Sequence, residues 1–222
     1  MSSESLDISQ MCAERPAPDA RLEQFLMTTQ AVEHQAAYLS RTLSSDLVIL
    51  GDDDHISIPV ALIDPRRKVL VIDTDHRVLA SLAQWINRLE IGNVELIHAD
   101  LRNYARPPGA FEAFYANPPW SSKNGGHGLR YWLSRALDLC TPSCAGVLAL
   151  PGNDLGWINS NWLSMQEYSA QNGLRWVEID AVRCQYEHTN QAGLYSQNVH
   201  MQRTDPQRRL SEQARQGEGI YR

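Results

Sequence analysis

The chain has 222 residues, of which 43% are hydrophobic and 21% are charged, and its formal net charge is −6. This length and composition indicate one soluble globular domain with a single sizeable core. They argue against a nucleic-acid-binding protein, because a negative net charge steers cationic or neutral ligands toward the surface rather than polyanions.

In chain order, short apolar runs alternate with helical patterns. We predict helices at 21–43, 55–63, 76–92, 128–140 and 156–173, and strands at 46–50, 68–73, 94–100, 111–120, 145–151, 175–182 and 193–203. The helix at 55–63 requires Pro59 to lie in its first turn, since a proline further along would clash with the preceding turn.

The strand pattern predicts the fold class. Continuous apolar strands separated by helices indicate a parallel α/β sheet covered on both faces. The last two strands have only a loop between them, which indicates one antiparallel strand. This seven-stranded, mostly parallel layout resembles the Rossmann-like class I methyltransferase fold, whose cofactor is S-adenosylmethionine. We expect an N-terminal tail and helical lid at 1–44, a catalytic domain at 45–203 and a polar tail at 204–222.

The N-terminus has no targeting signature. Its first residues, "MSSESLDISQMCAERPAPDA", are polar and acidic, and no segment approaches the roughly 20 apolar residues of a membrane span. We therefore expect a cytoplasmic protein with neither a membrane nor a nucleic-acid partner.

Cysteine and histidine spacing gives no sign of a metal. Cys12, Cys140, Cys144 and Cys184 form no CxxC pair, so reduced structural thiols are expected. The seven histidines show no HxH or HExxH spacing, and no metal site is predicted.

The first strand ends in Gly51-Asp52-Asp53-Asp54. Open α/β sheets bind ligands outside the carboxyl ends of their strands, and a glycine there allows close approach of the backbone. One aspartate is expected to cap the next helix, but three exceed what capping requires. At least one should therefore face a cationic or amine-bearing ligand.

The second and third strands also end in acids. Asp73 lies about 20 residues beyond the glycine, where such folds grip ribose hydroxyls, and Thr74 is assigned to the same site. Asp75 reads as the N-cap of the following helix. Asp100 and Leu101 follow the third strand, where this fold commonly contacts the adenine amino group, although a strand-end Asp is frequent in any turn.

The fourth strand runs into Asn117-Pro118-Pro119-Trp120. The prolines remove donors and leave carbonyl acceptors, while Asn117 adds an amide oxygen and Trp120 a flat aromatic face. This set suits an ammonium or a sulfonium through cation–π contact, although an "NPP" turn is also common. The Gly-rich segment 121–128 is predicted to be a lid, or else an ordinary connection.

The segments "GDDD" (51–54), "DTDHR" (73–77) and "NPPW" (117–120) resemble the catalytic domain of the branched-chain polyamine synthases, the N4-bis(aminopropyl)spermidine synthase family. The resemblance covers roughly residues 45–150. It implies that an acid of 52–54, with Asp53 preferred and Asp54 next, deprotonates the attacking amine. It also implies that Asp73 holds the nucleoside ribose.

Three departures from that family bear on the substrate. Only one helix is predicted before the first strand, which leaves no room for the family's N-terminal accessory domain. "NPPW" replaces an acidic DPP form, and the composition, with 18 Arg but only Lys68 and Lys123, is not that of a hyperthermophile. We therefore expect the scaffold to be retained and the substrate to have changed.

The resemblance implies C–N bond formation at the three-carbon arm of S-adenosylmethionine or its decarboxylated form, with release of methylthioadenosine. The acceptor is either the amine of S-adenosylmethionine itself, closing to azetidine-2-carboxylate, or a separate amine that receives an aminopropyl or aminocarboxypropyl group. The compact chain and less acidic motif slightly favour cyclisation. A free amine at neutral pH costs about 3 pKa units, or about 4 kcal/mol, which a placed carboxylate lowers.

Two rival functions stay open. An amino-methyltransferase acting on a small molecule would use an NPP-aromatic motif in the same way, and a non-enzymatic nucleoside-binding protein would keep the fold without the reaction. A homodimer is compatible with the sequence, which does not identify the amine.

Overall fold

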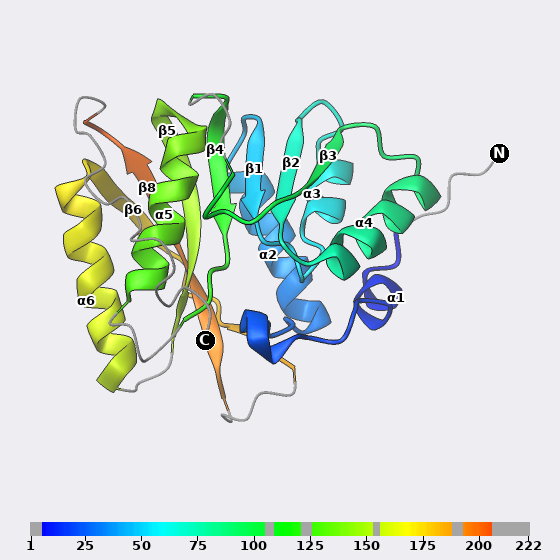
Figure 1. The fold of residues 1–222 in the computed structure, drawn as a ribbon, viewed down its shortest axis with the longest axis horizontal. Coiled ribbons are helices and arrows are strands. Elements are labelled where there is room, and N and C mark those ends of the chain that lie inside the picture. Colours follow the sequence, from blue (N-terminus) through cyan, green and yellow to red (C-terminus); the bar gives the residue numbers. More distant parts are fainter. Residues whose placement is uncertain (1–5, 105–108, 121–125, 153–155, 188–192, 206–222) are drawn as a thin grey trace.

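The computed structural model describes residues 6–104, 109–120, 126–152, 156–187 and 193–205. One sheet runs through the molecule, with strands in the order β3-β2-β1-β4-β5-β8-β6, and β7 pairs with β8 (Figure 1). The strands are β1 (Leu47–Leu50), β2 (Val69–Asp73), β3 (Val94–His98), β4 (Phe111–Ala116), β5 (Cys140–Pro151), β6 (Leu174–Ile179), β7 (Cys184–Gln185) and β8 (Tyr195–Arg203). The pairs among β1 to β5 are parallel, whereas β8 is antiparallel to β5, β6 and β7.

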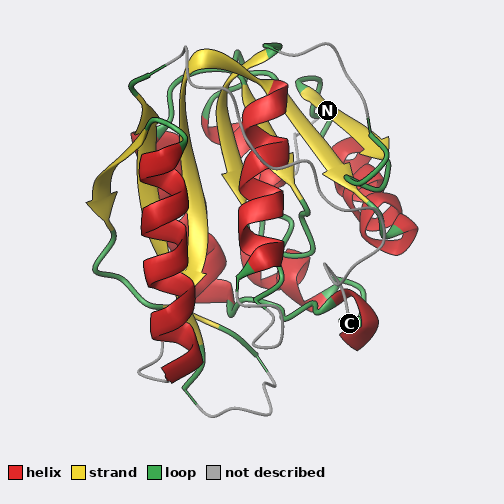
Figure 2. Cartoon of the chain, turned by 60° about the vertical axis from the view of Figure 1, so that its left-hand side comes forward, coloured by secondary structure: helices red, strands yellow, loops and turns green. Residues whose placement is uncertain are grey.

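Helices cover both faces of the sheet (Figures 1 and 2). They are α1 (Ile8–Ala13), the 3₁₀ turn η1 (Ala20–Leu22), α2 (Thr29–Thr42), α3 (Ser57–Ile63), α4 (His76–Arg88), α5 (His127–Leu139) and α6 (Gly156–Gln171). Alternate strand residues face opposite ways, so the sheet has two cores. Side chains of α1 to α4 pack with Leu47 and Ile49 of β1, while those of α5 and α6 pack with Val48 and Leu50.

The predicted fold class is confirmed. Seven strands of the predicted order form the continuous sheet, and the two-residue β7 is an addition that the pattern did not reveal. Pro59 lies in the first turn of the seven-residue α3, as its fixed φ requires.

The prediction of one helix at 21–43 is wrong in its first part. After η1, the chain is helical again only from the start of α2. Glu23 adopts a left-handed backbone (φ 56°) that ends η1, and the Thr28 side chain caps α2 by accepting from the Ala31 N–H. The helix α1 was not predicted either. The segment 14–28 between α1 and α2, here named the N-terminal strap, crosses the carboxyl edge of the sheet instead.

The strand β5 starts earlier in the chain than the predicted strand 145–151. The strand begins at Cys140 rather than at 145, because a register shift between Phe111 and Ala113 of β4 lets pairing continue past the proline of "CTPSC".

All four cysteines are free and buried, as predicted. Among the described residues, no helix is both long and apolar enough to cross a bilayer.

Candidate functional site

The three predicted motifs meet at one edge of the sheet. The ends of β1, β2 and β4 are in register, with Leu50 opposite Ile72 on one side and Ala116 on the other. The segments that follow them therefore emerge side by side. Strand order reverses between β1 and β4, which is the place where open α/β sheets bind ligands.

A cleft at this edge has two adjoining lobes. The first lobe has about 380 Å³ of empty space, which includes space open to solvent. It is lined by Leu22, Glu23, Gln24, Gly51, Asp53, Asp73, Thr74, Asn117, Pro119 and Trp132. The second lobe has about 260 Å³ and is lined by Glu23, Phe25, Asp53, Asn117, Pro118, Pro119, Trp120 and Tyr186. Glu23, Asp53, Asn117 and Pro119 belong to both lobes, so they form the boundary between them.

Gly51 directly follows β1 and lines the first lobe, close to Trp132. Its φ of +69° suits glycine, and a Cβ there would lie 3.1 Å from the buried Trp132 ring. The Trp132 indole forms one wall of the lobe that Gly51 also lines, and the predicted close approach of a ligand to Gly51 stays a prediction.

Asp52 is the residue that caps the following helix. Its carboxylate accepts hydrogen bonds from the Ile56 N–H (2.7 Å) and the Ser57 N–H (3.1 Å). The side chain is buried, and burial raises the pKa of Asp52 to about 8 despite these donors. Its predicted contact with the cofactor stays a prediction, since it is not among the described residues that line the lobes.

Asp73 joins the turns that follow β1 and β2. Its carboxylate accepts from the Asp52 N–H (2.9 Å) and the Asp75 N–H (2.7 Å), while the residue also lines the first lobe. Burial raises the pKa of Asp73, with these donors working against it. The carboxylate is thereby fixed beside the first lobe, and its predicted contact with ribose hydroxyls stays a prediction. Asp75 caps α4, as predicted.

Asp53 stands at the boundary of the lobes, half-buried beside other acids. Desolvation raises its pKa well above the usual carboxyl range, and the charges of Asp54, Asp73 and Asp52 raise it further. A nearby cation would stabilise the charged form of such a carboxylate. The raised pKa of Asp53 also reduces the difference from the pKa of an amine.

Asp54 is directed elsewhere. Its buried carboxylate takes a hydrogen bond from Arg15 Nη1 (3.0 Å), from the Met27 N–H (2.6 Å) and from Asn117 Nδ2 (3.4 Å). Burial raises the pKa of Asp54 to about 6, although Arg15 lowers it. Asp54 therefore anchors the N-terminal strap, and its predicted role in catalysis stays a prediction.

Asn117 is held by polar contacts on both sides. Its Nδ2 donates to Asp54, and its Oδ1 accepts from the Tyr186 hydroxyl over 3.3 Å. The same hydroxyl forms a second hydrogen bond, over 3.0 Å, with the Ser196 hydroxyl. The ring of Trp120 meets that of Tyr186 edge-on at 5.3 Å, and its Nε1 donates to the Ala149 carbonyl. The amide and both rings are thus fixed around the second lobe.

The residues after β3 are engaged outside the two lobes. Asp100 pairs with the Arg102 guanidinium, which lowers its pKa, and Leu101 is buried in the core beneath α5. Neither is among the described residues that line the cleft, so the predicted contact with adenine is untested. Segment 121–125 of the predicted lid lies outside the described residues.

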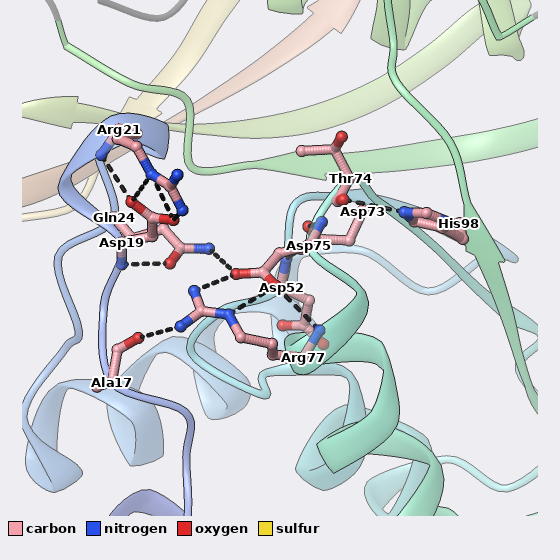
Figure 3. A network of polar contacts seen from close by, with 10 residues as sticks. All are labelled: Ala17, Asp19, Arg21, Gln24, Asp52, Asp73, Thr74, Asp75, Arg77 and His98. Atoms are coloured by element: carbon pink, nitrogen blue, oxygen red, sulfur yellow. Dashed lines mark hydrogen bonds and ion pairs between the residues drawn. The ribbon is translucent and has the colours of Figure 1, made fainter.

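The sequence predicted a helical lid at 1–44 but not the non-helical N-terminal strap, which supplies Leu22 to Phe25 to the cleft. Figure 3 shows how it is attached: Gln24 Nε2 donates to Asp75 (3.2 Å), and Arg77 Nη1 donates to the Ala17 carbonyl (3.2 Å). The capping pattern at Thr28 was the available signal that helix α2 starts late. Trp132 and Tyr186 also line the cleft, although aromatic residues at helical or strand spacing belong to a core more often than to a pocket.

The sheet order, the single antiparallel strand and the cleft at the β1–β4 reversal define a class I S-adenosylmethionine-dependent transferase fold. Solved structures agree. The N-methyltransferase NodS of Bradyrhizobium japonicum, with bound S-adenosyl-L-homocysteine, matches with a TM-score of 0.58 at 14% identity, over 89% of this chain and 99% of that one. The model of the branched-chain polyamine synthase A C-terminal domain matches residues 6–218, and the chain belongs to that family.

Individual relatives point the same way. The N(4)-bis(aminopropyl)spermidine synthase of Methanocaldococcus jannaschii is 30% identical over 113 residues, which are 47% of this chain and 31% of that protein. The enzyme of the same name from Thermococcus kodakarensis is 24% identical over 145 residues, covering 62% and 40%. This chain thus spans less than half the length of these curated relatives.

A solved member of the family shares the fold. The branched-chain polyamine synthase of Thermus thermophilus, in complex with N4-aminopropylspermidine and 5′-methylthioadenosine, matches with a TM-score of 0.77 at 20% identity. The match covers 96% of this chain and 66% of that chain.

Proposed function

We propose that this chain is a transferase that moves a three-carbon aminopropyl-type group from a sulfonium nucleoside to a separate amine and releases 5′-methylthioadenosine. The observation that carries the proposal is the pair of lobes that meet at Asp53. A donor in the first lobe and an acceptor in the second would bring the reacting carbon and nitrogen together beside this carboxylate.

The first lobe fits the donor. Asp73 presents a carboxylate for ribose hydroxyls, Trp132 a flat wall, and the acids around Asp53 an electrostatic field that favours a positive sulfur. The sulfonium supplies an electrophilic carbon and a neutral thioether leaving group. S-adenosylmethionine and its decarboxylated form both present this group, and members of the family point to the decarboxylated form.

The second lobe fits an amine. Asp53 accepts the proton of the ammonium, the free nitrogen forms a bond to the arm carbon that is bonded to the sulfonium sulfur, and the electrons of that C–S bond pass to sulfur as methylthioadenosine leaves. The raised pKa of Asp53 makes the proton transfer less uphill than with an ordinary carboxylate. Asn117, Trp120 and Tyr186, whose polar groups are engaged with one another or with the backbone, position the acceptor rather than react.

The second lobe favours transfer over cyclisation. Closing S-adenosylmethionine on its own amine needs no acceptor site, yet a second lobe with aromatic walls lies beside the donor lobe. Small-molecule N-methylation also needs an acceptor lobe. It is distinguished from transfer by its nucleoside product, which is S-adenosylhomocysteine rather than 5′-methylthioadenosine.

Product analysis separates these functions. The purified chain is incubated with S-adenosylmethionine or its decarboxylated form, with and without amines, and the nucleosides are identified by mass spectrometry. Amine-dependent 5′-methylthioadenosine supports transfer, and the same product from S-adenosylmethionine alone supports cyclisation. S-adenosylhomocysteine as the sole product would establish methylation. Nucleoside binding without turnover would favour a binding protein.

A further inference from the structure

Cys140 and Cys144 lie at the amino end of β5, at the edge of the sheet opposite the cleft. On the neighbouring β4, Phe111 pairs with Cys140. Ala113, only two residues further on, pairs with Ala145, which is five residues further along β5. Two residues of β4 span roughly 7 Å, whereas five residues of straight strand would span about 16 Å. The segment 140–145, here named the β5 bulge, therefore folds back on itself.

The β5 bulge brings two thiols together beneath the surface. Cys140 and Cys144 are buried in the core that α5 and α6 cover, whereas Pro142 and Ser143 between them are exposed. Pro142 has no N–H to donate to a strand ladder, which suits a bulge. The two thiols form a hydrogen bond with each other. Their sulfur atoms are therefore neighbours, as the formation of a disulfide requires.

The two thiols differ in reactivity. Their hydrogen bond raises the pKa of Cys140, which burial raises further, and lowers the pKa of Cys144. Burial opposes the effect at Cys144, while the positive charge of Arg203 adds to it. Because the thiolate is the nucleophile, Cys144 should react first. The other two thiols are not activated, since burial raises the pKa of Cys12 and raises that of Cys184 to about 12.

Two close thiols also occur in metal sites. A structural zinc ion takes four protein ligands. In the part of the chain that the structure describes, however, no group of three or more His, Cys, Asp or Glu side chains is arranged to hold a metal ion. Oxidation is the chemistry that a pair of thiols supports without a third group.

We infer that Cys140 and Cys144 form a reversible disulfide when the protein meets a peroxide, so that the β5 bulge is a site of oxidative modification. The Cys144 thiolate attacks one oxygen of hydrogen peroxide, the O–O bond breaks, and a sulfenic acid and hydroxide form. The Cys140 sulfur then attacks the Cys144 sulfur, the S–S bond forms, and the S–O bond breaks. The two thiol protons leave in two molecules of water, so one peroxide is the only other reactant. This modification is independent of the proposed function.

The main test uses the wild-type protein. Native protein is treated with hydrogen peroxide, unfolded in urea, alkylated with iodoacetamide and digested with trypsin. Cleavage after arginine leaves Cys140 and Cys144 together in peptide 136–175, apart from Cys12 and Cys184. We expect peptide 136–175 to escape alkylation at both cysteines and to be alkylated at both when dithiothreitol is added first. The peptides that contain Cys12 and Cys184 should be alkylated in either case.

Two variants test the order of the reaction with dimedone, which traps sulfenic acids. Cys140→Ser removes the sulfur that closes the disulfide, so the dimedone adduct should accumulate on Cys144. Cys144→Ser should give about tenfold less adduct on Cys140, because a thiol with a raised pKa forms little thiolate. Cys12→Ser is the matched control and should form the disulfide like the wild type.

The inference is overturned if native wild-type protein stays alkylated at both cysteines of peptide 136–175 after the peroxide treatment. A cross-link between two chains in place of the internal bond, or equal protection of Cys12 and Cys184, would overturn it as well. Equal amounts of adduct in Cys140→Ser and Cys144→Ser would refute the order in which the two sulfurs react. These results do not depend on turnover, so they leave the proposed transfer reaction to its own test.

Discussion

Arg15 and Asp54 form a buried ion pair in which Arg15 Nη1 lies 3.0 Å from Asp54 Oδ1, with side chains 0% and 3% exposed. Arg15 also donates to the carbonyls of Cys12 and Met27. The pair ties a segment that precedes the sheet to the acidic turn after β1. One of the three consecutive aspartates therefore stabilises the wall of the cleft.

Replacing Arg15 by Met should destabilise the protein strongly. The substitution leaves Asp54 buried without its cation, and breaking such a pair by removing one partner costs about 3–5 kcal/mol. Urea unfolding followed by circular dichroism measures the loss. Adding Asp54→Asn to this variant should recover part of it, because the orphaned charge is then removed. Arg21→Gln, which breaks an exposed pair on the same strap, should leave the midpoint unchanged. Equal midpoints for Arg15→Met and wild type would contradict this role for the pair.

The positions of the acids could be predicted from the sequence because strand ends are local features. Apolar runs fix where β1, β2 and β4 stop, and parallel pairing then brings Gly51, Asp73 and Asn117 to one edge. The separate role of each aspartate at 52–54 could not be predicted. Which aspartate caps α3 and which meets Arg15 depends on backbone geometry and on a segment 39 residues away.

The strap was missed for a related reason. Residues 21–28 carry apolar side chains at helical spacing, and the interruption at Glu23 depends on contacts with Asp54 and Asp75 that no local pattern records. Aromatic residues such as Tyr186 read equally well as core. Its hydroxyl faces Asn117 only because β7 pairs with β8 beside the cleft.

Asp53→Asn should abolish most of the amine-dependent release of 5′-methylthioadenosine. Loss of a general base typically costs about 10²–10⁴ in rate. Because the pKa of Asp53 is raised, the wild-type rate should fall as pH drops through a value above the usual carboxyl range, and the variant should lack this acidic limb. A pH profile of kcat/KM for the amine checks this. Affinity for 5′-methylthioadenosine, measured by calorimetry, is the control and should change little. A variant with wild-type rates would remove Asp53 from the proposed mechanism.

Because of Asp52, the free energy of unfolding should fall as the pH rises. Its pKa goes from an ordinary 3.8 to about 8 on folding, so the folded state holds an extra proton between these values. Within this interval a rising pH favours the unfolded state, whose carboxyl is already deprotonated, over the folded state that keeps its proton, so the free energy of unfolding falls by at most about 1.4 kcal/mol per pH unit for one carboxyl. Urea midpoints measured from pH 5 to pH 8 should therefore decline. Asp54, whose pKa is about 6, should make the decline steeper at the low-pH end of this range.

Asp52→Asn should flatten this decline, because the amide oxygen can still accept from the Ile56 N–H but no longer titrates. Asp19→Asn provides the comparison: Arg21 holds the pKa of Asp19 at about 2, so its titration lies below the measured window. The same slope in Asp52→Asn as in the wild type would show that Asp52 does not carry the extra proton.

Gly51→Ala should impair both folding and nucleoside binding, whereas Gly92→Ala should impair neither. At Gly51 an alanine would have to adopt φ +69°, with its Cβ 3.1 Å from Trp132, and unfavourable backbone conformations of this kind cost about 1–3 kcal/mol. Relief requires Trp132 to shift by a few tenths of an ångström, and because Trp132 lines the first lobe, the shift changes the wall that the donor would meet. At Gly92 the backbone is not left-handed and a Cβ meets nothing within 4 Å. Thermal melts and calorimetry with 5′-methylthioadenosine measure both effects. If Gly51→Ala melted like Gly92→Ala and bound the nucleoside equally well, Trp132 could not be a close-packed wall of that lobe.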